Sequence, residues 1–209
     1  MVFLHKGEPL LTFQHRRLHE WPPEGGSSTL CESLPHHQHR KQMDLSIALL
    51  REIGWEGAAM VEYRYDPAHD RFVLMEINGR FWGSQPLAFH AGAQFGWLTY
   101  SVLGRRVVPD ISPPKVGVLC RYLIPDIKRL LRIVFQPGKI QDRSLRFGWM
   151  AEICNLLRYF CRGGETSYVW WRQDSGPFFA DMHHVALRAL RLGRDARRST
   201  SSCTISQAS

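Results

Sequence analysis

The stretch FVLMEINGRFWGS, residues 72–84, begins like a buried strand and ends on polar side chains. Successive side chains of a strand point to opposite faces, so Glu76 and Asn78 share one face. Arg80 follows Asn78 after a single glycine. A carboxylate, an amide and a guanidinium therefore meet where the strand leaves its sheet, and this favours a functional site over a plain core strand.

A second strand is expected at 58–65, AAMVEYRY, joined to the first by the short segment 66–70. If the two strands form a hairpin closed by that segment, Glu62 faces Leu74 and lies diagonal to Glu76 on the same face. A register shift of two residues would place the two carboxylates directly opposite each other. Like charges so placed destabilise a sheet unless something positive lies between them. The pattern therefore favours a bound cation.

The oxygen-bearing side chains of this face, Glu62, Glu76 and Asn78, are hard ligands of the kind that Mg²⁺ takes in proteins. No soft ligand lies near them in the sequence to favour zinc or copper. We predict a metal site formed by these three residues. The alternative is a solvated sheet face, on which Arg64 and Arg80 form salt bridges with the two glutamates.

The remaining patterns mix strands and helices, so the predicted fold class is α+β. The first part should contain a hairpin over 1–18, a Pro- and Gly-rich loop over 19–35 and a helix over 35–53 that ends at Gly54. Helical turns broken at glycines should follow the polar strand end, and amphipathic helices should follow these. The breaks are expected at Gly92 and Gly96 within 85–104, and the helices at 127–135, 146–160 and 181–192.

A cluster of prolines at 109–114 marks a change of organisation. We therefore predict three parts of the chain. Residues 1–108 form an antiparallel sheet with packed helices, 109–198 form a helical extension, and 199–209 form a disordered tail.

The composition is ordinary for a globular protein but carries an excess of positive charge. The chain has 209 residues, a formal net charge of +8 and five cysteines without a Cys-x-x-Cys pair, which favours reduced thiols over a zinc site. It shows no secretory signal and no apolar run of the roughly 20 residues that a membrane span needs. We expect a cytoplasmic protein without membrane contact. Its Arg-rich tail lacks interleaved aromatic residues and a recognition motif, so nucleic-acid binding is not favoured.

The two strands, VEYRYD…FVLMEINGRFWGS, resemble the C-terminal, metal-binding half of the ATP-grasp superfamily. In that half an acidic residue on one strand precedes a Glu-x-Asn-x-Arg run on the next. The wider stretch from Phe13 to Gly104 is similar to the branch of carbamoyl-phosphate synthase large subunits and carboxylate–amine ligases. The positions that match the motif are Glu62, Glu76, Asn78 and Arg80.

This resemblance implies phosphoryl transfer from ATP to a carboxylate, followed by attack of an amine on the acyl-phosphate. The three oxygen ligands would hold Mg²⁺ or Mn²⁺ and, through it, ATP. Arg80 would be the catalytic residue that acts on the migrating phosphoryl group, and Arg16 and Arg17 would add phosphate contacts. The loop at 25–29, Gly-Gly-Ser-Ser-Thr, could offer backbone N–H groups and hydroxyls to an anion.

A complete ATP-grasp fold clamps ATP between two α+β subdomains, whereas only 12 residues precede Phe13 here. We therefore expect a fragment or a natural truncation, or a second chain that supplies the first half. The 209 residues alone should neither bind ATP tightly nor turn over, and a micromolar dissociation constant for ATP in calorimetry would contradict this. The alternative to an enzyme portion is an inactive remnant that serves as a binding or scaffold module.

Overall fold

The computed structural model describes residues 1–140, 148–162 and 164–188. Largely antiparallel sheets are combined with packed helices, so the predicted α+β class is confirmed. The chain divides into two compact units, Met1–Tyr168 and Val169–Ser209. All predicted site residues belong to the first unit.

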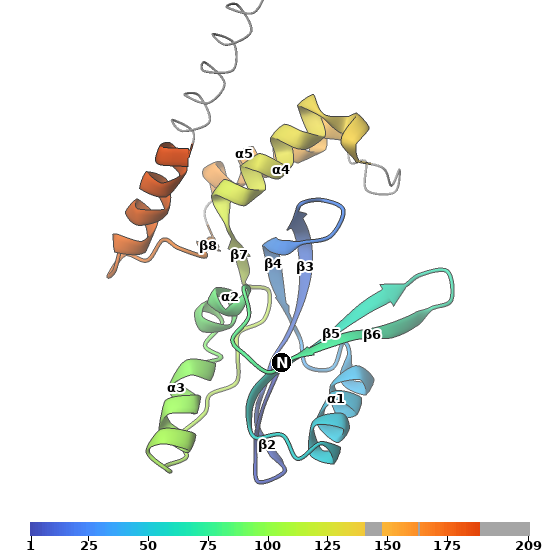
Figure 1. Ribbon diagram of the computed structural model, residues 1–209, viewed down its shortest axis with the longest axis vertical. Coiled ribbons are helices and arrows are strands. Elements are labelled where there is room, and N and C mark those ends of the chain that lie inside the picture. The colour runs from blue at the N-terminus through green and yellow to red at the C-terminus, as the bar shows by residue number, and fades with distance from the viewer. Residues whose placement is uncertain (141–147, 163, 189–209) are drawn as a thin grey trace, which may run out of the picture. The chain divides into compact units, whose positions relative to one another are not determined.

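The first sheet has the strand order β2-β1-β5-β6 and is antiparallel throughout (Figure 1). Its central strand β1 carries Val2, Phe3 and Leu4, whose side chains are fully buried. A fully buried strand must be apolar on both faces, and this explains the unbroken apolar run at its start. The strand bounds are Val2–His5 for β1, Glu8–Thr12 for β2, Gly57–Asp66 for β5 and Arg71–Asn78 for β6.

The second sheet has the order β3-β4-β7-β8, in which only the β7–β8 pair is parallel. Its long hairpin, β3–β4, and the β5–β6 hairpin diverge from the middle of the first unit (Figure 1). The bounds are Gln14–Trp21 for β3, Ser27–Leu34 for β4, Leu119–Arg121 for β7 and Glu165–Ser167 for β8.

Of two sequence predictions at the N-terminus, the hairpin is confirmed with a shorter second strand, and the loop was wrong. The hairpin expected at 1–18 is present as β1–β2, and residues 14–18 begin β3. In the loop expected at 19–35, residues 19–21 finish β3 and residues 27–34 form strand β4. The turn is confined to the Pro- and Gly-rich residues 22–26. Strand β4 is buried on both faces, and its Ser and Thr side chains hid the apolar alternation by which strands are recognised.

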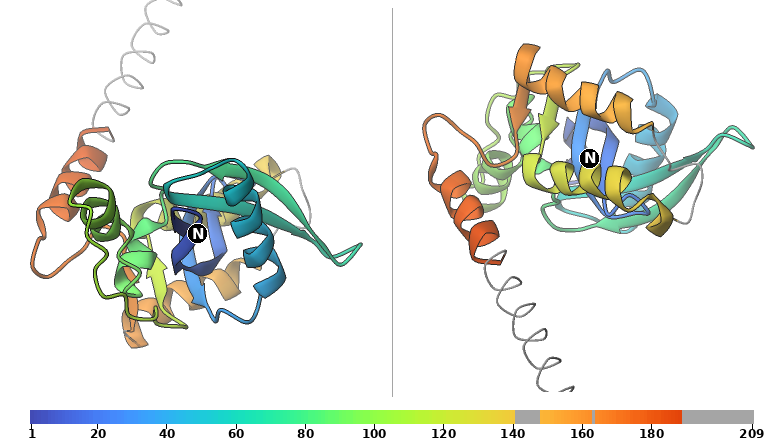
Figure 2. Two further views of the ribbon diagram at one scale, coloured as in Figure 1. Left: turned by 90° about the horizontal axis from the view of Figure 1, so that it is seen from below. Right: turned by 90° about the horizontal axis from the view of Figure 1, so that it is seen from above.

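Helix α1, Arg40–Glu52, packs on the first sheet as predicted, although it begins later than expected. Its Met43, Ile47 and Leu50 meet buried side chains of β1 and β5. Figure 2 shows the helix alongside these strands from two directions. Gly54 ends the helix with a φ of 64°, a conformation that favours glycine.

The segment after β6 forms the short helices α2, Gln85–His90, and α3, Phe95–Thr99, followed by a π-helical turn at Tyr100–Gly104. The break predicted at Gly92 is confirmed, since this residue has a φ of 88°. The break predicted at Gly96 was wrong, because this residue lies inside α3.

The extension predicted at 109–198 contains strands as well as helices. It contains α4, Leu123–Phe135, and α5, Trp149–Arg162, close to two of the predicted helices, but β7 and β8 add strands to the second sheet. The division predicted at residue 108 falls inside the first compact unit. In the second unit residues 176–188 are helical, and the predicted tail at 199–209 lies outside the described residues. Among the described helices, none has the length and apolar character of a membrane span.

Candidate functional site

The β5–β6 hairpin carries the two predicted carboxylates. From the hairpin end, Tyr65 pairs with Phe72 and Tyr63 pairs with Leu74. The register then shifts by one residue, so Glu62 pairs directly with Glu76. Cross-strand partners share a face, with Cβ atoms about 5 Å apart. The bulge therefore brings the two carboxylates together.

This register corrects the first expectation and matches its alternative. Glu62 does not face Leu74, for two reasons. The hairpin closes with Asp66 opposite Arg71, which shifts the register by one residue, and the extra residue Met75 on β6 shifts it by one more, so that Glu76 opposes Glu62. Bulges re-aim side chains beside functional sites, and side-chain alternation in the sequence cannot predict them.

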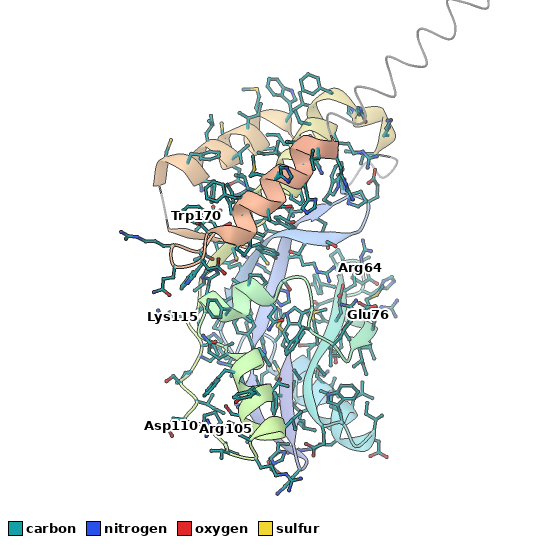
Figure 3. The ribbon with its side chains drawn as sticks, turned by 60° about the vertical axis from the view of Figure 1, so that its left-hand side comes forward. Arg64, Glu76, Arg105, Asp110, Lys115 and Trp170 are labelled. Carbon is teal, nitrogen blue, oxygen red and sulfur yellow. The ribbon has the colours of Figure 1, made fainter. Side chains whose placement is uncertain are left out.

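Glu76 and Asn78 lie together at the end of β6. The Asn78 side-chain amide donates a hydrogen bond of 2.5 Å to Oε1 of Glu76. Its amide oxygen thus remains on the same face as the two carboxylates. The Glu76 side chain is exposed, and Figure 3 shows it on the same hairpin as Arg64. The solvated-face alternative needs Arg64 or Arg80 as a salt-bridge partner of a glutamate, and within the described residues neither forms such a pair.

Arg80 stands in the loop between β6 and α2, where its guanidinium is exposed and donates to the Phe81 carbonyl over 3.2 Å. The loop itself is fixed at its other end. Trp82 is buried against Phe95, with 5.1 Å between ring centroids. Ser84 forms a 3.1 Å hydrogen bond with the ring Nε2 of His15 on β3. Burial and nearby positive charge, including Arg17, lower the pKa of His15 to about 3, so its imidazole is neutral.

Gly79 lets the main chain pass close to an aromatic ring just before Arg80. A Cβ atom at this position would lie 2.3 Å from Cη2 of Trp55, closer than side-chain atoms approach one another. The glycine of the Glu-x-Asn-x-Arg run is therefore required by packing.

We expect Gly79→Ala to lower the free energy of unfolding by about 1–3 kcal/mol, because the ring or the loop must move. Thermal unfolding followed by circular dichroism measures this loss. Gly83→Ala is the matched control, since a Cβ atom there would meet nothing within 4 Å. Equal unfolding temperatures for the two variants would show that the close approach to Trp55 is not limiting.

The two predicted phosphate-binding arginines of β3 are both engaged by carboxylates. Arg16 pairs with Glu32 of β4 at 2.7 Å, on an exposed surface. Arg17 pairs with Glu62 at 2.5 Å and with Glu20 at 3.5 Å. The structure therefore brings Arg17 to the carboxylate pair, whereas Arg16 has a partner on the neighbouring strand.

A cleft of about 1020 Å³ lies between β3, the start of α1 and the β5–β6 hairpin. Arg16, Arg17 and Glu62 line it, while Glu76, Asn78 and Arg80 do not. The carboxylate pair thus stands at the edge of the cleft, with one member facing into it. The apolar side of the cleft is formed by Met43, Tyr65, Phe72 and Met75.

Sequence reasoning missed His19 and Arg129, which also line the cleft. Arg129 comes from α4 and pairs with Glu152 of α5 at 2.6 Å, so it reaches the cleft from the predicted extension. The two residues are 110 positions apart, and no local pattern connects them.

A buried ion network holds α4 against the second sheet. Asp126 accepts hydrogen bonds from Thr29 at 3.0 Å and pairs with His19 at 2.8 Å and with Arg121. Arg121 also pairs with Glu165 at 2.9 Å. Burial alone would raise the pKa of Asp126, but the His19 and Arg121 interactions outweigh burial and lower this pKa. The network fixes the side of the cleft to which His19 and Arg129 belong.

Two of the three hydroxyls of the predicted anion loop at 25–29 are engaged within the fold. Thr29 and Ser28 are buried in β4, and the Thr29 hydroxyl donates to Asp126. Gly25 and Gly26 form the turn, where a Cβ atom at Gly26 would lie 2.2 Å from the Trp21 carbonyl oxygen. These two glycines line the cleft, but packing already accounts for Gly26, and a φ of 129° accounts for Gly25.

The donor set fits a hard cation. Within the described parts of the chain no group of three or more His, Cys, Asp or Glu side chains is arranged so that it could hold a metal ion. Two opposed carboxylates and one amide oxygen are then the available ligands, and all are oxygens. Mg²⁺ takes such ligands and fills its other positions with water and phosphate oxygens.

The thiols of the described residues offer no competing centre. Cys31 and Cys120 are buried, Cys154 and Cys161 are exposed, and all four are free. Burial raises the pKa of Cys31 and raises that of Cys120 to about 12, so neither is an activated nucleophile.

Comparison with known proteins gives one family. Residues 29–93 match the family model described as carbamoyl-phosphate synthase L chain, ATP binding domain. The match spans less than a third of the chain; it includes Glu62 and Arg80 with everything between them and leaves out Arg16 and Arg17. Neither a curated protein nor a solved structure matches the chain. The match supports the resemblance to the ATP-grasp superfamily that the Glu-x-Asn-x-Arg run predicted.

Proposed function

We propose that the chain supplies the cation- and phosphate-binding portion of a ligase that activates a carboxylate with ATP and joins it to an amine. The observation that carries the proposal is the direct pairing of Glu62 with Glu76 across the bulged hairpin, with Asn78 beside it. The ATP-binding family of residues 29–93 supports this role for the same strands.

Glu62, Glu76 and Asn78 would hold Mg²⁺ or Mn²⁺. A cation held there would offset the negative charge of the ATP phosphates during transfer. The two glutamates otherwise repel each other, so their opposition is relieved when the positive charge is present. Arg17 offsets the charge of Glu62 alone, whereas a bound cation would offset the charge of both glutamates.

Arg80 would stabilise the charge that develops on the transferred phosphoryl group. Its guanidinium is exposed on a loop held by Trp82 and Ser84, so it is both accessible and positioned. Preorganised positive groups of this kind lower the barrier to phosphoryl transfer without reorganisation at the moment of reaction. Arg16 and Arg17 line the cleft from β3 and could contact further phosphate oxygens.

The acyl-phosphate would form when a substrate carboxylate oxygen attacks the terminal phosphorus and ADP leaves. The amine then attacks the acyl carbon, and inorganic phosphate departs with the formation of the C–N bond. The remaining contacts to ATP would come from an ATP-grasp first half, in a partner chain or elsewhere in a longer protein.

Paramagnetic broadening tests the proposed site in the 209-residue chain. Mn²⁺ with millimolar ATP should broaden the backbone amide signals of 60–64 and 74–80 before other signals, because relaxation falls steeply with distance from the ion. Mg²⁺ in excess should restore them. Broadening centred on a different part of the chain would contradict the proposal and would favour a binding module without a nucleotide site.

A further inference from the structure

Arg17 and Glu62 form an ion pair between two different sheets. Arg17 belongs to β3 of the second sheet and Glu62 to β5 of the first, and the distance from Nη2 to Oε2 is 2.5 Å. Both side chains are about three-quarters buried, with 28% and 24% of their surface exposed. The guanidinium therefore neutralises one member of the carboxylate pair.

The other member of the pair is treated differently. Glu76 accepts from the neutral amide of Asn78, and among the described residues no Lys or Arg lies within ion-pair distance of it. Glu62 and Glu76 face each other across the strands, so the single positive charge of Arg17 lies beside two opposed negative charges. A divalent cation would supply two positive charges to these carboxylates. The Arg17 guanidinium supplies one of them in its place.

Arg17 also has a second partner within reach. Its Nη1 atom lies 3.5 Å from Oε1 of Glu20, three residues along the same strand. A guanidinium that leaves Glu62 can thus remain in the cleft, held at Glu20, with its remaining N–H groups directed to an anion. The cleft lining includes all three residues.

We propose that Arg17 is the internal competitor of the divalent cation: it occupies Glu62 when the site is free, and cation binding releases it to the phosphate groups. This inference rests on the proposed function, because it assumes that Glu62 and Glu76 bind the cation. It adds an ordering of events. The cation weakens an ion pair that ties the two sheets together, and the nucleotide phosphates then compensate the released arginine.

Mn²⁺ binding to the 209-residue chain, measured without nucleotide by the loss of the free-ion signal in electron paramagnetic resonance, tests the competition. Arg17→Gln should bind MnCl₂ roughly five- to tenfold more tightly than the natural chain, because a positive charge next to the ligand is removed. Arg17→Lys keeps the charge and should keep the weaker affinity. Arg40→Gln is the matched control, since Arg40 is exposed and its ion pair with Asp44 is long, at 3.9 Å. This variant should leave the affinity for Mn²⁺ unchanged.

The outcomes separate this inference from the function on which it rests. If Glu76→Gln weakens Mn²⁺ binding while Arg17→Gln leaves it unchanged or weaker, the competition is refuted and the cation site stands. If neither substitution alters Mn²⁺ binding, both the competition and the cation site are refuted. Circular dichroism of each variant verifies folding, and Arg17→Met, which also removes the charge, repeats the test if Arg17→Gln unfolds.

Discussion

Asp126→Ala is expected to lower the free energy of unfolding by about 3–5 kcal/mol, which corresponds to a fall in melting temperature of roughly 10 °C or more. Asp126 is 4% exposed and is the shared partner of His19, Thr29 and Arg121. Its removal leaves the guanidinium of Arg121 buried without one of its two carboxylates. Breaking a buried ion pair from one side is costly because the remaining charge is uncompensated.

Asp44→Ala is the control for this prediction, since Asp44 forms an exposed helix pair with Arg40 and should cost less than about 0.5 kcal/mol. Thermal or urea unfolding followed by circular dichroism compares the two. Similar losses in both variants would mean that the network does not hold α4 to the sheet.

The same carboxylate predicts how stability changes with pH. The pKa of Asp126 is lower in the folded protein than in the unfolded chain, so its ionised form stabilises the fold above the unfolded pKa. This contribution is lost as the pH falls below about 4 and then through the lower, folded pKa. The difference in unfolding free energy between the natural chain and Asp126→Asn should therefore narrow in that range. A constant difference down to pH 2 would contradict the assigned ionisation.

Glu76→Gln should reduce turnover at least about 100-fold in the complete enzyme, because the cation loses a charged ligand and the transferred phosphoryl group loses its counter-charge. The fold should not suffer. Glu76 is exposed and opposes Glu62, so removal of its charge relieves a repulsion and should leave the cation-free chain equally stable or slightly more stable. A variant that is inactive yet undiminished in stability is the signature of a ligand.

A structural role for Glu76 predicts the reverse pattern. If its carboxylate holds the hairpin together, Glu76→Gln should lose stability and keep activity at ordinary Mg²⁺ concentrations. Glu8→Gln serves as the control, since Glu8 is exposed and forms a surface pair with Arg51 at 3.2 Å. It should change neither turnover nor stability by more than a surface substitution does.

The β5–β6 hairpin and the polar end of β6 could be predicted from the sequence, because both depend on local patterns. Alternation placed Glu76 and Asn78 on one face, and the apolar spacing of Met43, Ile47 and Leu50 predicted α1. The register of the β5–β6 hairpin was harder to predict from the sequence. The bulge at Met75 inserts one residue without a distinctive sequence signal, so the pairing of the carboxylates was left as one of two alternatives.

Other features could not be predicted because they depend on contacts between distant parts of the chain. Strand β4 contains Ser28, Thr29 and Ser33, and such residues are typical of loops unless another element buries them. The element that buries Thr29 is α4, whose Asp126 lies 97 residues further on. The contribution of Arg129 to the cleft depends on the same docking.

The central claim is that a divalent cation binds between Glu62 and Glu76, and anomalous diffraction from crystals soaked in MnCl₂ tests it most directly. The account predicts an anomalous peak about 2.0–2.3 Å from a carboxylate oxygen of each glutamate, with the Arg17 guanidinium moved away from Glu62. Occupied Mn²⁺ sites elsewhere, with Arg17 still bound to Glu62 and no peak at the bulged hairpin, would contradict it.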